Sequence, residues 1–241
     1  MPSTQTLSPG REQPRIDAAL ERLSAERVVA RLWQKDASLW SDDSKVQASI
    51  RNRLGWLAAP AMMARRMDEV ARIAADIRAA GFTHALLLGM GGSSLFSEVC
   101  RHTFGVAKGS LDLAILDSTD PARIRAHEAR APLKKTIAIV SSKSGATSEV
   151  EALSKYFYHA FRRADGNPGA HLLAITDAGT PLETLAREWK LRHAFIHGPD
   201  SGADVGGRFS AFVGFGLLPA ALLGVDVQVL RARMEEGQQR C

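Results

Sequence analysis

The residues best suited to chemistry lie in a short loop between an apolar segment and a helical pattern. Residues 137–140 are apolar and mostly β-branched, which is typical of a buried strand, and a helical pattern begins near Ser148. Between them lies the segment 141–147, SSKSGAT, which we call the cradle loop. Backbone N–H groups, the positive end of a helix dipole and a lysine all favour a dianionic phosphate. The cradle loop therefore predicts a phosphate-binding site.

Two further polar loops stand in comparable positions. GMGGSS at 89–94 follows an apolar run and precedes a helical pattern, and DVGGRFS at 204–210 places a guanidinium after two glycines. Each has an ordinary structural interpretation, because glycine-rich turns are common and an arginine beside one is usually solvated. Three such loops along one open α/β sheet favour a ligand site, since these sheets bind ligands at the carboxyl ends of their strands.

The three strings, in this order, resemble the signatures of the glucose-6-phosphate isomerase family, specifically of its first sugar-isomerase (SIS) domain. The resemblance covers about Gly81 to Val229, and DVGGRFS is its most specific part. The preceding residues, with Trp33, Trp40 and Trp56, are similar to the lead-in of isomerase modules fused to transaldolases.

The resemblance implies an enzyme of glycolysis and gluconeogenesis that interconverts glucose 6-phosphate and fructose 6-phosphate without a metal or organic cofactor. It implies that Arg208 is catalytic, because a fixed guanidinium suits the negative charge of an enediolate. The residues that it implies for substrate binding are Gly92, Ser93, Ser142, Lys143, Ser144, Thr147 and Gly207. The structural alternative for Arg208 is that it braces the loop before an expected helix at 209–223.

Lys143 is the strongest single candidate in the cradle loop. It follows a buried strand directly, where its charge would lack a partner that a phosphate supplies. Thr147 and Ser148 have a second interpretation as helix caps, since Ser148 and Glu151 have the spacing of a capping box. Both roles can coexist, because one hydroxyl can cap while others face the ligand.

The 89–94 loop has a competing interpretation as a dinucleotide-binding turn. Gly89-x-Gly91-x-x-Ser94 lacks the third glycine, but Asp117 ends the next expected strand, where a ribose-binding acid would lie. The cradle loop argues against this interpretation, because a dehydrogenase needs no second phosphate site there.

The resemblance does not supply a general base within these residues. The family's catalytic Glu, His and Lys lie in a second SIS domain, and this chain ends at Cys241 before any of them. Glu98, Glu149 and Glu183 lie near expected loop ends, but none matches a catalytic position of the family. We therefore expect little isomerase activity from these residues alone.

Composition limits the classes of partner. The 241 residues are 45% hydrophobic and 24% charged with a net charge of +5, as in a globular protein, and the surplus weakly favours an anionic ligand. Neither a basic block with interleaved aromatic residues nor an apolar membrane span is present, so neither nucleic acid nor membrane is expected as a partner. Two distant cysteines and a polar N-terminus predict a cytoplasmic location. The histidines lack metal-ligand spacing, and His193 and His197 are interpreted as ordinary strand residues.

Alternating strand and helix patterns predict the architecture. Strands are expected near 84–88, 112–117, 136–141, 171–176 and 193–197. Repeated β–α units give a parallel sheet with helices on both faces, so we expect a doubly wound, five-stranded α/β domain, which the resemblance makes SIS-type and Rossmann-like. The expected organisation is a disordered segment at 1–14, a helical arm at 15–80, an SIS sugar-phosphate-binding domain at 81–230 and a truncated helix or tail at 231–241.

Two apolar surfaces raise the question of assembly. They are the stripe of Met63, Met67, Val70, Ala74 and Ile77, and the apolar segment 211–225. Such surfaces require cover, which predicts a homo-oligomer or a second SIS domain that packs on them. The alternative function is a sugar-phosphate sensor without catalysis, although residues 15–80 show no helix-turn-helix pattern or basic helix.

Overall fold

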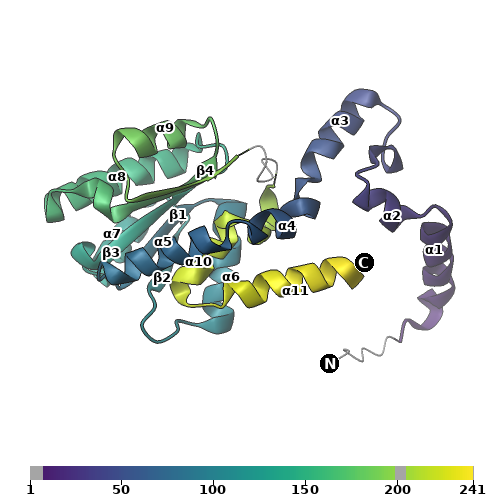
Figure 1. Cartoon of the computed structure of the whole chain (residues 1–241), viewed down its shortest axis with the longest axis horizontal. Helices are drawn as coiled ribbons and strands as arrows, with labels where there is room; N and C mark the ends of the chain where they lie inside the picture. The colour runs from purple at the N-terminus through teal and green to yellow at the C-terminus, as the bar shows by residue number, and fades with distance from the viewer. Residues whose placement is uncertain (1–7, 199–204, 241) are drawn as a thin grey trace. The chain divides into compact units, whose positions relative to one another are not determined.

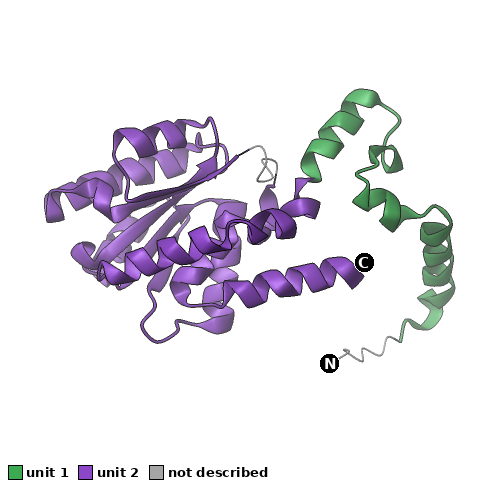
Figure 2. Ribbon diagram, viewed as in Figure 1, with its two compact units in different colours: residues 1–54, 241 green, residues 55–240 purple. Residues whose placement is uncertain are grey.

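The computed structural model describes residues 8–198 and 205–240. The chain forms two compact units, of which the first ends at Leu54 and the second spans Gly55–Arg240 (Figure 2). Residues 55–80, which the sequence analysis assigned to a helical arm, therefore belong to the second unit. Of the segment expected to be disordered, residues 1–7 lie outside the described residues, and a turn of 3-10 helix, η1 (Gly10–Glu12), precedes the first α-helix.

The first unit contains three α-helices. They are α1 (Gln13–Ala25), α2 (Val28–Trp33) and α3 (Ser44–Arg53), with the short turn η2 (Ala37–Leu39) between the last two. The Asp43 carboxylate accepts hydrogen bonds from two backbone N–H groups in the first turn of α3, which fixes where that helix begins.

The second unit is built on a five-stranded parallel sheet (Figure 1). Its strands are β1 (His84–Gly89), β2 (Asp112–Leu116), β3 (Thr136–Ser141), β4 (Leu172–Asp177) and β5 (His193–His197). Their spatial order is β2-β1-β3-β4-β5, and every neighbouring pair is parallel. The expected doubly wound α/β sheet is therefore confirmed, with each strand within a residue or two of its expected position.

Helices cover both faces of this sheet. Leu87 and Ile139 pack toward α5 (Met67–Ala79), α6 (Leu95–Phe104) and α10 (Gly214–Leu223). Leu88 and Val140, one residue further along each strand, pack toward α7 (Pro121–Arg130), α8 (Ser148–Asp165) and α9 (Pro181–Glu188). This alternation is the period-two pattern of a strand buried on both sides.

Short elements complete the second unit. They are η3 (Gly55–Ala58), α4 (Ala59–Ala64), η4 (Gly91–Ser93), η5 (Leu133–Lys135), η6 (Pro168–His171), η8 (Gly207–Phe212) and α11 (Val227–Arg240). The expected helix at 209–223 is therefore a 3-10 turn followed by α10. No helix in the described part of the chain is long and apolar enough to cross a membrane.

The two apolar surfaces that were expected to need a partner cover each other. All five residues of the Met63–Ile77 stripe are at most 2% exposed, and they lie in one hydrophobic cluster with the side chains of α10. Since α10 is buried along its whole length, the stripe and the greater part of the segment 211–225 are already covered. The physical reason for expecting an oligomer from these two surfaces is therefore removed.

Candidate functional site

The connections that leave the neighbouring strands β1 and β3 diverge. The chain leaves β1 for α6 on one face, whereas it leaves β3, the strand beside β1, for α8 on the opposite face. At such a switch point the loops separate and leave a crevice at the carboxyl ends of the strands, where open α/β sheets bind ligands. Gly89 and Ser141, the last residues of β1 and β3, are register partners. The 89–94 loop and the cradle loop therefore flank this crevice.

The third predicted loop reaches the same place through a backbone contact. A Cβ atom added to Gly92 would lie 2.3 Å from the carbonyl oxygen of Gly207, so only glycine allows the two loops to approach this closely. On the other side of the 89–94 loop, the Ser93 carbonyl oxygen accepts a hydrogen bond from Ser141 Oγ at 3.0 Å. The resemblance implied a substrate-binding role for Gly92, whereas its close neighbour in the structure is the protein's own backbone.

The cradle loop has a defined internal arrangement. Ser142 is buried, and its hydroxyl lies 3.1 Å from that of Thr147. Ser144 Oγ accepts a hydrogen bond from the Ala146 N–H group at 3.3 Å and remains exposed. Gly145 has a φ of +64° and lies against Thr180. Any L residue in its place would strain the backbone and clash with Thr180. The loop is therefore held in shape by its own hydroxyls and by its contact with the start of α9.

The helix that follows the cradle loop begins differently from the expected capping box. Its N-cap residue is Thr147, and Ser148 is already inside the helix, where its hydroxyl bonds to Glu149. The Thr147 hydroxyl makes no hydrogen bond to the first turn, because it is directed to Ser142 instead. The first-turn N–H groups of α8 thus lack a side-chain acceptor from the N-cap residue, which leaves them available to an anion.

Lys143 has a protein partner, contrary to the sequence argument. Its ammonium nitrogen lies 3.5 Å from a carboxylate oxygen of Asp177, the last residue of β4. The other oxygen of Asp177 lies 3.7 Å from Nδ1 of His197, the last residue of β5. Sequence analysis missed Asp177, although its place at a strand end beside the cradle strand could have indicated it.

His197 is more than an ordinary strand residue. Its ring is 2% exposed, and Nε2 accepts a hydrogen bond from the Gly214 N–H group at 3.1 Å, while Nδ1 lies 3.3 Å from the Thr176 carbonyl oxygen. These partners require a neutral ring with its proton on Nδ1. Burial is the main cause that lowers the pKa of His197 to about 4, despite the nearby Asp177 carboxylate. His197 thereby ties the end of β5 to the segment that follows Arg208.

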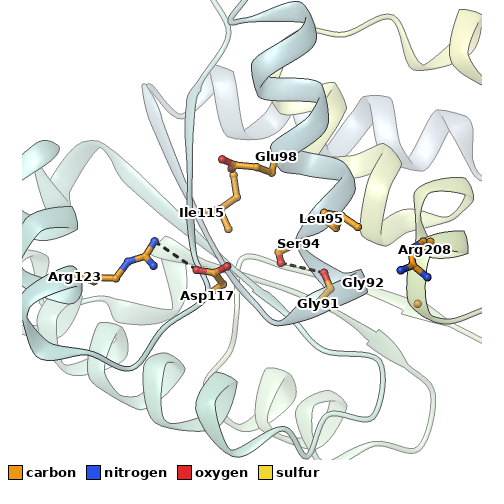
Figure 3. A pocket seen from close by; sticks show the side chains of 10 residues that line it. Gly91, Gly92, Ser94, Leu95, Glu98, Ile115, Asp117, Arg123 and Arg208 are labelled. Atoms are coloured by element: carbon orange, nitrogen blue, oxygen red, sulfur yellow. Dashed lines mark hydrogen bonds and ion pairs between the residues drawn. The ribbon is translucent and has the colours of Figure 1, made fainter.

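Arg208 lies in η8 at the edge of a cavity of about 460 Å³. The cavity, which we call the α6–β2 cavity, is lined by Gly91, Glu98, Asp117, Arg123, Gly207 and Arg208 among others (Figure 3). Phe209, the neighbour of Arg208, stacks on Trp56 with ring centroids 4.3 Å apart, which anchors η8 within the second unit. Arg208 itself is exposed. Asp204, the first residue of the third string, lies outside the described residues.

The three carboxylates considered as bases occupy different positions. Glu98 faces the α6–β2 cavity, where one of its oxygens lies 2.9 Å from His102 Nε2. Glu149 is exposed at the start of α8, and Glu183 accepts a hydrogen bond from the Gly179 N–H group at the start of α9. Glu98 is therefore the only one of these three that faces the cavity. Among the residues that the structure describes, no group of three or more potential ligand side chains could hold a metal ion.

Curated relatives share part of this chain. It is 32% identical over 157 residues to a glucose-6-phosphate isomerase of Gloeothece citriformis, covering 64% of this chain and 29% of the relative. It is 30% identical over 231 residues to a glucose-6-phosphate isomerase of Geobacter sulfurreducens, covering 87% of this chain and 40% of the relative. The chain thus spans well under half of the length of these relatives. No family model matches it.

Solved structures share its fold. A hypothetical protein from Thermus thermophilus superposes with a TM-score of 0.75 at 27% identity, covering 95% of this chain and 51% of that one. A glucose-6-phosphate isomerase from Chlamydia trachomatis superposes with a TM-score of 0.58 at 22% identity, covering 79% of this chain and 34% of that one. Both likenesses cover most of the present chain but at most about half of the other protein.

Gly92→Ala should destabilise the protein, because the new Cβ atom would force the Gly207 backbone to move. We expect a loss of about 1–3 kcal/mol, as for other overpacked sites, measured as a shift of the urea midpoint. Gly206→Ala is the matched control, since among the described residues a Cβ atom there would meet just the Lys143 side chain, at an ordinary 3.7 Å. Equal stability of the two variants would contradict the close backbone contact.

Stability should fall as the pH is lowered from about 6.5 to about 4. In this window the unfolded state binds a proton at His197 that the native state excludes, so the free energy of unfolding decreases by up to about 3 kcal/mol. His197→Gln should be less stable at neutral pH but should lose this part of the slope. Urea unfolding between pH 4 and 7 measures both slopes, and parallel profiles would refute the buried neutral imidazole.

Proposed function

We propose that the chain binds hexose 6-phosphates and supplies half of an isomerase site. Its homologues are glucose-6-phosphate isomerases and its fold is a doubly wound parallel sheet, so it fits an SIS domain of that family. The reaction would interconvert glucose 6-phosphate and fructose 6-phosphate. The observation that carries the proposal is the convergence of three loops at one switch point, through Gly92 against Gly207 and Ser141 against Ser93. Loops from distant parts of the sequence thus meet at the carboxyl ends of the strands.

The phosphate would bind at the cradle loop and the start of α8. This helix has 18 residues, and its N-cap hydroxyl is directed away from the first-turn N–H groups. Lys143 adds a full positive charge, and the Ser144 hydroxyl is exposed beside it. The Asp177 carboxylate does not prevent this role, because an ammonium has three donors and can bind a carboxylate and a phosphate oxygen together. Ser142 and Thr147 would shape the loop and offer hydroxyls from its inner side.

Arg208 would stabilise the enediolate. Isomerisation moves a proton between two neighbouring carbons through an intermediate whose oxygens carry negative charge. A guanidinium is always charged and presents its donors in a rigid plane, so it suits this task better than an ammonium. The side chain lies at the edge of the α6–β2 cavity, and its backbone is anchored by Gly207 against Gly92 and by Phe209 against Trp56.

The base would come from a second SIS domain. Proton abstraction requires a carboxylate or another base within hydrogen-bonding reach of the reacting carbon. Glu98, the one of the three candidate bases that lines the cavity, already has His102 at 2.9 Å and Arg101 at 3.7 Å around one oxygen. That oxygen is therefore already engaged by side chains of α6 itself.

Lys143→Ala should weaken binding of glucose 6-phosphate by about 10- to 100-fold, because a charge-assisted hydrogen bond contributes about 1.5–3 kcal/mol. Isothermal titration calorimetry with glucose 6-phosphate and with free glucose measures this. Lys155→Ala is the matched control, since Lys155 is an exposed lysine that pairs with Glu151 on the same helix, α8. The phosphate site would be refuted by equal affinities for glucose and its phosphate, or by wild-type affinity in Lys143→Ala.

The chain alone should convert fructose 6-phosphate slowly, since loss of a general base costs on the order of 100- to 10,000-fold in rate. Addition in trans of a second SIS domain from a relative should raise the rate, and Arg208→Ala should then abolish most of it. Arg187→Ala, which removes an exposed arginine of α9, is the control. A coupled spectrophotometric assay follows the product.

Rapid turnover by the chain alone would contradict the assignment of the base to a second domain. Tight sugar-phosphate binding with no turnover in any combination would favour a sensor instead.

A further inference from the structure

We propose that the α6–β2 cavity binds the hydroxyl groups of the sugar and that Asp117 selects for a polyhydroxylated ligand, an inference that rests on the proposed function. Figure 3 shows the arrangement: Glu98 and Asp117 lie toward one side of the cavity and Arg208 toward the other. The volume of about 460 Å³ lies within the range of small-molecule sites.

The carboxylates of the cavity make it suitable for hydroxyl groups. Two carboxylates, Glu98 and Asp117, line the same space as two guanidinium groups, Arg123 and Arg208. A carboxylate repels a dianion, whereas it accepts hydrogen bonds from hydroxyl groups through up to four lone pairs. A sugar phosphate needs both environments, because one end is a dianion and the other is an uncharged polyol. The cradle loop and the cavity divide these tasks.

The two sites are joined by the 89–94 loop. Gly91 and Gly92 line the cavity, and the Ser93 carbonyl is bonded to Ser141, which opens the cradle loop. A phosphate held at the cradle loop therefore leaves the rest of the ligand beside the wall of the cavity that these glycines form. No side chain projects from this wall at Gly91, where an added Cβ atom would meet no described neighbour within 4 Å, so the sugar can approach the backbone closely there.

Asp117 is better placed than Glu98 to accept hydroxyls. The nearest charged partner of Asp117 is Arg123, whose nitrogen lies 3.6 Å from one carboxylate oxygen, beyond hydrogen-bonding distance, and both side chains are about half exposed. Glu98 is already engaged with His102 and Arg101. Asp117 thus retains acceptor capacity on both oxygens, which suits a pair of neighbouring hydroxyls.

The chain offers a matched control for Asp117. Asp112, at the opposite end of β2, pairs with Arg130 of α7 at 2.8 Å, just as Asp117 faces Arg123 of the same helix. Asp112 does not line the α6–β2 cavity. Asp112→Asn therefore removes the same charge from the same pair of elements without touching the proposed subsite.

The test is calorimetry with the full chain and three ligands. Glucose 6-phosphate carries both the phosphate and the hydroxyls, hexyl phosphate carries the phosphate alone, and NAD tests the dinucleotide alternative. Asp117→Asn should weaken binding of glucose 6-phosphate by about 10- to 100-fold, since hydrogen bonds to a charged group are involved. Its affinity for hexyl phosphate should stay unchanged or rise, because a negative charge is removed. Asp112→Asn should bind both ligands as the wild type does, and thermal unfolding checks that both variants fold.

Three results would overturn the proposal. Wild-type affinity of Asp117→Asn for glucose 6-phosphate would remove the subsite, and so would an equal loss of both phosphates. NAD binding that Asp117→Asn abolishes would make the cavity a nucleotide site. The proposed function fails separately: if hexyl phosphate binds wild type and Lys143→Ala equally, the cradle loop is not the phosphate site, whatever Asp117 does. If none of the ligands binds wild type, both proposals fall.

Discussion

The contact between the backbones of Gly92 and Gly207 is the constraint on which the rest of the site depends. It holds the loop after β1 against η8, so that a guanidinium from the C-terminal part of the chain lies at the carboxyl end of a central strand. Neither residue contributes a side chain. Any substituent at Gly92 would push the two segments apart, and with them the cavity wall and Arg208. The position of Arg208 thus depends on the absence of a side chain at Gly92.

A second set of contacts positions the same elements from the other side of the crevice. Asp177 lies between Lys143 of the cradle loop and His197, and His197 in turn accepts the N–H group that opens α10. A neutral, buried imidazole suits this task, because it can accept at Nε2 and donate at Nδ1 simultaneously. A protonated ring could not accept from Gly214. The low pKa of His197 is therefore a consequence of burial that also preserves the connection between β5 and the segment after Arg208.

The strands of the sheet could be predicted from the sequence, because the apolar pattern that indicates a strand is local. Strands such as 136–141 and 193–197 depend on a few neighbouring residues, and each lies where it was expected. The predictions that differed depend on contacts between distant residues. Lys143 has Asp177 as a partner from another strand, Thr147 turns its hydroxyl to Ser142 instead of capping α8, and the Met63–Ile77 stripe packs beside α10. Periodicity showed that this stripe must be buried, but it could not show by what.

The site is exposed to solvent, which explains why the residues of this chain alone would bind a ligand better than they would catalyse its isomerisation. Arg208 and Ser144 are both exposed at the edge of the sheet, so that water surrounds the charges that the reaction would use. The attraction between opposite charges at a fixed distance is several-fold weaker in water than near a partly buried protein site. Stabilising an enediolate therefore requires a surface that closes over this edge and excludes water. A covering domain would do more than supply a base, because it would also strengthen the interaction that we propose between Arg208 and the intermediate. Binding of a phosphate is less demanding, since N–H donors and an ammonium attract a dianion even at an open helix end. The proposed division between an open phosphate site and a reaction centre that needs cover therefore rests on how water weakens each of the two interactions.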